Sequence, residues 1–301
     1  MFSIALFMKN FIWGLVFLFI GQFVIAQNPV VDRDILLDLY NSTQGEHWNH
    51  TWDLAQPIST WYGVVVKGEK VVELNLFNNG LQGHLPNSIG DLGELRILNL
   101  AFNNLQGTIP ERIVLLKQLR ELRLGKNEFS GALPKNIGNL TQLRILDVYN
   151  NKLTATIPSS VGKLVHLQML VLSDNFFEGH IPEAIGDLRM LEGLELGNNN
   201  LEGQLPQSLG KLLALNRLVL AENRLIGEVP EQILSLPNLQ LLQLQNNLLA
   251  GNIAIGSTMN KEKYALLDVG VKRLEFDAKR RNGFKFDAKS KMADTKFEED
   301  D

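Results

Sequence analysis

Prolines and asparagines recur at one fixed interval along most of this chain, and that interval constrains the fold more than any other feature. Seven of the 10 prolines lie 24 residues apart, and an asparagine stands seven residues before each. The prolines are Pro86, Pro110, Pro134, Pro158, Pro182, Pro206 and Pro230. The asparagines are Asn79, Asn103, Asn127, Asn151, Asn175, Asn199 and Asn223, and Asn247 continues the series. Such a period indicates a solenoid of stacked copies of one unit.

The repeated unit has the pattern LxxLxLxxNxLxGxIPxxIGxLxx, seen for example from Leu191 to Pro206. Leucines alternating with other residues are typical of a short strand with one buried face. One strand cannot bury its leucines alone, so neighbouring copies must form a continuous parallel sheet and core. The asparagine is expected to turn inward and satisfy buried backbone groups. The sequence therefore predicts an α/β repeat solenoid, with these asparagines as structural residues.

The unit resembles the plant-type leucine-rich repeat of plant receptor ectodomains, polygalacturonase-inhibiting proteins and many exported bacterial proteins. The resemblance covers residues 71–254. It implies a right-handed leucine-rich repeat superhelix with a concave parallel sheet and a mostly irregular or 3₁₀ convex side. It also implies a second short sheet formed by the LxGxIP segments, in which only Ala155 departs from the glycine.

Residues 27–70 are expected to form an N-terminal cap that covers the end of the core. Helical apolar spacing over residues 34–40 predicts a helix, and residues 64–72 predict a hairpin that leads into the first repeat. Plant relatives hold this cap with a cysteine pair, but the chain has no cysteine. Trp48, Trp52 and Trp61 are expected to stabilise the cap by apolar burial instead. The missing cysteines favour a bacterial source.

Five segments follow from these patterns. We expect a signal peptide at 1–26, the cap at 27–70, eight 24-residue repeats at 71–262, a degenerate ninth repeat or C-terminal cap at 263–280, and a charged, disordered tail at 281–301.

The first 26 residues have the layout of a secretory signal. An uncharged apolar run over residues 11–26 follows Lys9 and ends in Val24-Ile25-Ala26, which fits a cleavage site before Gln27. The run is short for a membrane span, although an uncleaved signal anchor is the alternative. Met8 is an alternative start to Met1. We therefore expect a secreted, periplasmic or cell-surface protein without a stable membrane span after cleavage.

Variable strand positions aligned across repeats predict a concave face that is basic in its first half and acidic in its second. Exposed aromatic residues would add anchors of the kind found at interfaces. The candidate ligand-binding residues are Phe77, Arg96, Phe102, Arg120, Arg123, Lys126, Arg144, Asp147, Tyr149, Asp174 and Glu195. The alternative is an ordinary solvated face with internal ion pairs.

Catalytic, metal and cofactor motifs are absent from the sequence. His47, His50 and Asp53 are the nearest approach to a metal site, and we expect neither a metal nor a cofactor. Asp147 and Glu195 resemble a carboxylate pair, but an open sheet is expected not to raise the pKa of a carboxyl group. We therefore expect no enzyme. The net charge of −4 argues against a nucleic-acid partner.

These features favour an exported leucine-rich repeat protein that binds a protein or peptide through its concave face, and we expect a monomer. A carbohydrate-binding or glycosidase-inhibitor-like protein is one alternative, by analogy with the polygalacturonase inhibitors. A passive structural or adhesive surface protein is the other.

Overall fold

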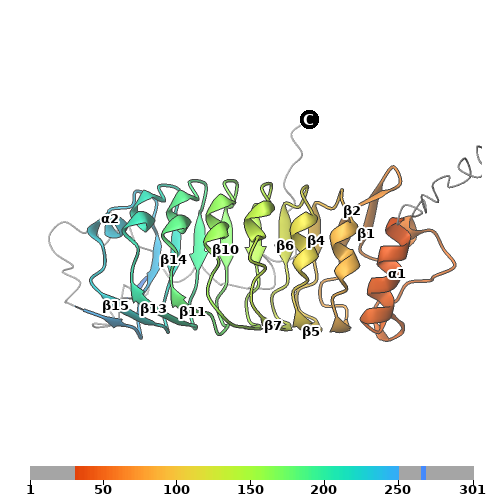
Figure 1. Cartoon of the computed structure of the whole chain (residues 1–301), viewed down its shortest axis with the longest axis horizontal. Coiled ribbons are helices and arrows are strands. Elements are labelled where there is room, and N and C mark those ends of the chain that lie inside the picture. Colours follow the sequence, from red (N-terminus) through yellow and green to blue (C-terminus); the bar gives the residue numbers. More distant parts are fainter. Residues whose placement is uncertain (1–30, 251–265, 269–301) are drawn as a thin grey trace, which may run out of the picture. The chain divides into compact units, whose positions relative to one another are not determined.

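The computed structural model describes residues 31–250 and the backbone of residues 266–268 (Figure 1). The predicted signal peptide at 1–26 and the charged tail at 281–301 lie outside the described residues. So does the expected ninth repeat at 263–280, apart from one strand. The description below concerns the unit that begins at Asp32.

A ten-stranded sheet runs through this unit; its first strand precedes the repeats, and each later strand comes from a successive repeat. The strands are, in spatial order, β1 (Val64–Lys67), β2 (Lys70–Asn75), β4 (Ile97–Asn99), β6 (Glu121–Arg123), β8 (Ile145–Asp147), β10 (Met169–Val171), β12 (Gly193–Glu195), β14 (Arg217–Val219), β16 (Leu241–Gln243) and β18 (Leu266–Asp268). The β1–β2 pair is antiparallel, and the later pairs are parallel. Sequence neighbours are therefore spatial neighbours throughout, as Figure 1 shows.

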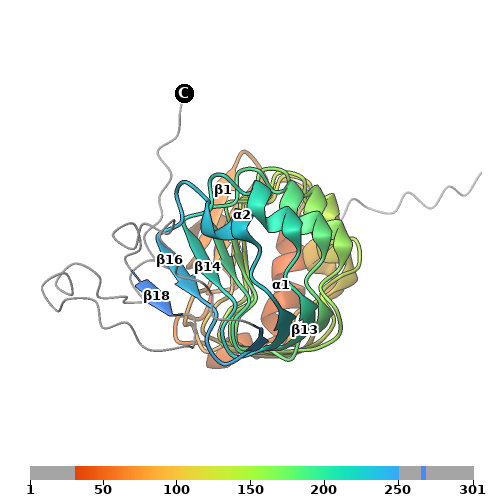
Figure 2. The same ribbon diagram turned by 90° about the vertical axis from the view of Figure 1, so that its left-hand side faces the viewer.

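Two four-stranded parallel sheets and a layer of 3₁₀ turns form the other faces of the unit. The first small sheet contains β3 (Gln82–His84), β5 (Asn104–Thr108), β7 (Glu128–Gly131) and β9 (Lys152–Leu153). The second contains β11 (Glu178–His180), β13 (Asn200–Gln204), β15 (Arg224–Gly227) and β17 (Leu248–Leu249). Figure 2 shows β14 and β16 on one side of the unit and β13 on another.

Short helical turns follow the prolines of the repeats. The 3₁₀ turns of the repeats are Asn87–Asp91, Glu111–Leu115, Ile137–Asn139, Ser159–Lys163, Glu183–Asp187 and Gln207–Lys211, and the last described repeat has the helix α2 (Glu231–Leu234) instead. These turns, together with the long parallel sheet, confirm the predicted repeat solenoid.

The core is a column of leucines and isoleucines supplied by every repeat. Leu98, Leu122 and Leu146 occupy equivalent strand positions, pair in register and are almost completely buried. Each repeat alone would leave these side chains in water, so the hydrophobic effect stabilises the stack rather than the single unit.

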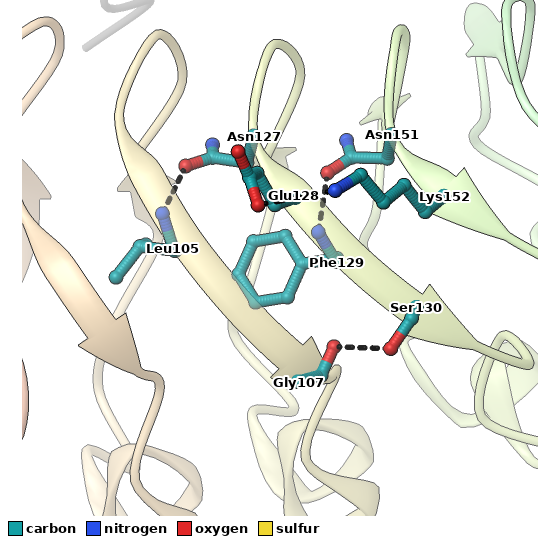
Figure 3. A network of polar contacts seen from close by, with 8 residues as sticks. All are labelled: Leu105, Gly107, Asn127, Glu128, Phe129, Ser130, Asn151 and Lys152. Atoms are coloured by element: carbon teal, nitrogen blue, oxygen red, sulfur yellow. Dashed lines mark hydrogen bonds and ion pairs between the residues drawn. The ribbon is translucent and has the colours of Figure 1, made fainter.

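The repeated asparagines form a buried ladder that ties each repeat to the one before it. Asn151 Nδ2 donates to the carbonyl oxygens of Leu124 and Val148, both at 3.0 Å. Its Oδ1 accepts the backbone N–H of Phe129 at 2.9 Å (Figure 3). Asn127 makes the same contact with the N–H of Leu105 at 3.0 Å. One amide thus satisfies backbone groups of two repeats.

The N-terminal end is covered by a helix and an aromatic cluster. Helix α1 (Asp32–Ser42) contains the helix expected at residues 34–40, and two further 3₁₀ turns follow at Gly45–His47 and Ile58–Thr60. The side chains of Trp48, Trp52 and Trp61 are all at least 95% buried, and the rings of Trp52 and Trp61 stack with centroids 4.6 Å apart. Each indole N–H donates to a backbone carbonyl, so burial leaves no indole donor unsatisfied.

The small-sheet layer divides in two at the repeat that contains Ala155. This alanine replaces the repeated glycine, yet it adopts φ 65°, and an isolated bridge between Thr156 and Glu178 is what joins the two small sheets. A left-handed backbone costs a residue with a Cβ roughly 1–2 kcal/mol. The expected second sheet is therefore present but interrupted at this substitution.

Asn151→Ala should lower the free energy of unfolding by roughly 2–4 kcal/mol, because it leaves buried backbone groups of two repeats without partners. Asn136 lies in the preceding repeat, is exposed and makes no side-chain cap, so Asn136→Ala is the matched control with little expected effect. Guanidinium unfolding followed by circular dichroism measures both. Equal midpoints for the two variants would contradict the proposed role of the ladder.

Ala155→Gly should raise the free energy of unfolding by about 1 kcal/mol, since glycine adopts the left-handed backbone without a Cβ penalty. Ala132 is exposed and lies outside the left-handed region. Ala132→Gly should therefore lower stability by roughly 0.5–1 kcal/mol through the entropy of the unfolded chain. The same sign of change in both variants would show that the backbone strain at Ala155 is absent.

Candidate ligand-binding face

Three arginines, Arg96, Arg120 and Arg144, occupy equivalent positions directly before strands β4, β6 and β8 of the large sheet. The N–H of Arg120 donates to the carbonyl of Arg96, and the N–H of Arg144 donates to that of Arg120, each at 2.7 Å. Arg120 is exposed, and the other two are half-buried. The backbone thus holds three like charges at adjacent positions, which gives this part of the face a positive potential. We call these three residues the basic column.

Arg123 and Asp147, two further candidates, are buried rather than exposed on the same face. Arg123 is 6% exposed, and its Nε lies 3.0 Å from Oε2 of Glu121, which is also buried. Asp147 is 2% exposed, and its Oδ1 accepts the N–H of Tyr149 at 2.9 Å. Because both groups are buried, their charges act within the sheet and they offer a ligand little surface.

The expectation that an open sheet leaves carboxyl pKa values unchanged is wrong for Asp147. Burial raises the pKa of Asp147 from 3.8 to about 6, against the opposing effects of the Tyr149 N–H and Arg123. The charge of Glu195 raises it further. The desolvation cost of an anion therefore exceeds the local stabilisation, although the strand lies at a face of the molecule.

Beyond the basic column, the large sheet carries an open pocket of about 430 Å³. Its lining residues are Tyr149, Ser173, Asp174, Glu195, Gly197, Asn198, Arg217, Val219, Ala221, Glu222, Leu241 and Gln243. Three of the candidate residues, Tyr149, Asp174 and Glu195, thus lie around one pocket. Glu195 Oε1 is 2.8 Å from Arg217 Nη1, so this pair is largely neutralised.

Aromatic candidates lie at two places on this face. The rings of Phe77 and Phe102 are half-buried and pack against each other with centroids 5.0 Å apart. Tyr149 is half-buried at the pocket, and Lys126 Nζ lies 5.7 Å from its ring centroid. Burial, followed by the charge of Asp174 and a hydrogen bond to it, raises the pKa of Tyr149. The Tyr149 site is therefore an aromatic surface in a negative potential.

One column of this face lies outside the candidate residues that the sequence indicates, namely the first residue of each strand that pairs in parallel. Its described members are Glu73, Ile97, Glu121, Ile145, Met169, Gly193, Arg217 and Leu241. These residues alternate with the inward leucines, so the period of two along the strand was the signal that identifies them. Arg217, which pairs with Glu195, belongs to this column.

Across residues 31–250, no three histidine, aspartate or glutamate side chains gather as a group able to hold a metal ion. Within the same residues, every helix is too short or too polar to cross a membrane.

The fold and the periodic face define a leucine-rich repeat solenoid, and comparison with known proteins agrees. Residues 118–200 match the model of a leucine-rich repeat region. Residues 70–92, 94–116 and 190–212 each match the leucine-rich repeat. The chain therefore contains leucine-rich repeats.

These repeats are similar to those of plant receptor ectodomains. The receptor-like serine/threonine-protein kinase EFR of Arabidopsis thaliana is 40% identical over 75 residues, which are 24% of this chain and 7% of EFR. The crystal structure of PEPR1–AtPEP1 matches with a TM-score of 0.73 and 32% identity, covering 79% of this chain and 34% of that one.

A third match is the Arabidopsis receptor kinase HAESA in complex with the peptide hormone IDA and the co-receptor SERK1. It has a TM-score of 0.68 and 31% identity, and the match covers 74% of this chain and 38% of that chain. The chain thus spans well under half the length of each of these three proteins.

Asp147→Asn should stabilise the protein near pH 7.5 by roughly 3 kcal/mol, because it removes a buried charge while keeping the acceptor for the Tyr149 N–H. The folded-state pKa of about 6 lies above the unfolded value of 3.8. The wild type therefore binds the proton more tightly when folded, and its stability falls as pH rises from about 4 to 6. The advantage of the variant should disappear below pH 4.

Urea unfolding at pH 4 and pH 7.5 measures this difference. Asp187 is an exposed aspartate, so Asp187→Asn is the control and should give the same pH dependence as the wild type. An Asp147→Asn advantage of equal size at both pH values would contradict a raised pKa at Asp147.

Proposed function

We propose that this protein is an exported binding protein that recognises another protein or a peptide through the face of its large sheet. That face is the one the sequence predicts to be concave. The observation that supports this proposal most is that the basic column and the open pocket lie on the same sheet. A surface with separate positive and negative regions suits an extended, polar partner better than a small apolar ligand.

The similar plant receptors support this proposal, because HAESA is found with a peptide hormone and a co-receptor. Their ectodomains share the stacked parallel strands of this chain. A binding role also fits the buried carboxyl of Asp147, which accepts a backbone N–H and is held in place rather than presented to a substrate.

We further propose export by a signal peptide at 1–26 and a bacterial source. The uncharged apolar run before Gln27 supports export, and the tryptophan cap without cysteine supports the source. The remaining proposed division is a cap at 27–70, repeats at 71–262, a closing repeat at 263–280 and a charged tail at 281–301. We propose that the protein acts as a monomer, without a cofactor or nucleic acid.

Arg120→Glu should strongly reduce capture of the partner, since it reverses the exposed charge at the centre of the basic column. Arg123 is left unchanged, because a second carboxylate beside Glu121 would be buried and would destabilise the fold. The measurement is affinity capture of proteins and peptides from the native cell envelope and medium, identified by mass spectrometry.

Lys163 is an exposed cation on a 3₁₀ turn away from the large sheet, so Lys163→Glu is the matched control and should capture normally. Specific capture by the wild type that Arg120→Glu leaves intact would refute recognition through the basic column. On a glycan array, reproducible sugar binding that is lost in Tyr149→Ala would instead favour the carbohydrate-binding alternative. Failure of both assays to reveal a ligand would favour a structural or adhesive role.

A further inference from the structure

The floor of the open pocket consists of three small residues at equivalent positions in successive repeats. Ser173, Gly197 and Ala221 are all buried, and they lie between the larger Tyr149 and Gln245 of the same column. A Cβ at Gly197 would lie 3.1 Å from Cγ1 of Val219 and 3.8 Å from Oγ of Ser173. The absence of a side chain there therefore keeps the space above the floor open.

Ser173 leaves an unsatisfied polar atom in this floor. The residue is 8% exposed, and its Oγ has no hydrogen-bond partner. Within residues 31–250, the other buried side-chain oxygen without a partner is Oε1 of Gln245, in the same column. A buried hydroxyl without a partner destabilises the fold, so its presence at a pocket points to a group that arrives from outside.

The charges around the pocket determine the sign of that group. Glu195 is paired with Arg217. Asp174 and Glu222 instead accept hydrogen bonds from the amides of Asn198 and Asn246, and neither forms an ion pair with a cation among the described residues. Two carboxylates thus remain uncompensated beside the unsatisfied hydroxyl. The nearby Lys126, whose Nζ faces the Tyr149 ring, shows that a cation is compatible with this aromatic surface.

We propose that this pocket is a subsite for a cationic side chain, lysine or arginine, of the bound peptide. The proposal rests on the peptide-binding function and specifies its partner. The ammonium or guanidinium donates to Asp174 and Ser173 Oγ, and the charge of Glu222 two strands farther along attracts it, while its aliphatic stem lies against Val219 and Ala221. It complements the basic column, which would bind an acidic part of the same partner.

The test uses blocked single amino acids, so it does not depend on identifying the partner. The probes are the N-acetyl, N-methylamide derivatives of lysine, arginine, norleucine and glutamate, titrated into the mature chain and followed by amide NMR shifts. Lysine or arginine should bind at least roughly tenfold more tightly than norleucine and shift the amides of Ser173, Gly197 and Ala221. Their affinity should fall with added salt.

Asp174→Asn combined with Glu222→Gln should reduce the affinity for the cationic probes roughly tenfold. Both residues have a left-handed backbone, at φ 57° and 58°. Asparagine tolerates that region well, and glutamine has the same length and branching as the glutamate that it replaces, so the fold is preserved. Glu178→Gln combined with Glu202→Gln removes two exposed carboxylates from the small sheet and is the matched control without expected effect.

Ser173→Ala removes the hydroxyl without leaving another group unsatisfied. The fold should therefore be unaffected while affinity for the cationic probes falls several-fold. The subsite is refuted if norleucine or glutamate binds as tightly as lysine and arginine, or if the pocket variants bind all probes like the wild type. Capture of a natural partner that needs Arg120 but not Asp174 and Glu222 would refute the subsite while leaving the proposed function intact.

Discussion

The hydrogen bonds of the buried asparagines hold the rest of this structure in register. Each amide bonds backbone groups in its own repeat and in the preceding one, as Asn175 does with Leu172 and Val148. Because the donors and acceptors are backbone atoms, the contact is the same whatever side chains the repeat carries outside. The strands can therefore stack at a constant spacing, and variable positions fall into straight columns on the large sheet. The basic column and the pocket floor are both consequences of that constancy.

Much of this arrangement was predictable from the sequence, because it depends on spacing alone. The leucine and asparagine periods predicted the stacked parallel strands, and the basic column followed from three arginines at one repeat position. The sequence also indicates Tyr149, Asp174 and Glu195 as ligand-binding candidates, and all three line the pocket. In each case the period determines which residues become neighbours, and the side chains of those residues determine the charge and polarity of the surface.

Burial on the face was not predictable in the same way. Arg123 and Asp147 occupy positions that face outward by period, yet both are buried. Whether a charge is covered depends on the sizes of its neighbours on two adjacent strands, which a single repeat does not contain. The same limit applies to the pocket, which exists because three small residues happen to follow one another in a column between Tyr149 and Gln245.

The buried charges connect the two halves of the face. Arg123 pairs with Glu121 on its own strand and lowers the pKa of Asp147 on the next, while Glu195 raises it from two strands away. Glu195 in turn pairs with Arg217 at the pocket. Protonation of Asp147 near pH 6 therefore removes a negative charge from the middle of a series of groups that extends from Glu121 to Arg217 at the pocket. Since the Asp147 carboxyl is held by the backbone N–H of Tyr149, its charge can change without a rearrangement of the strands.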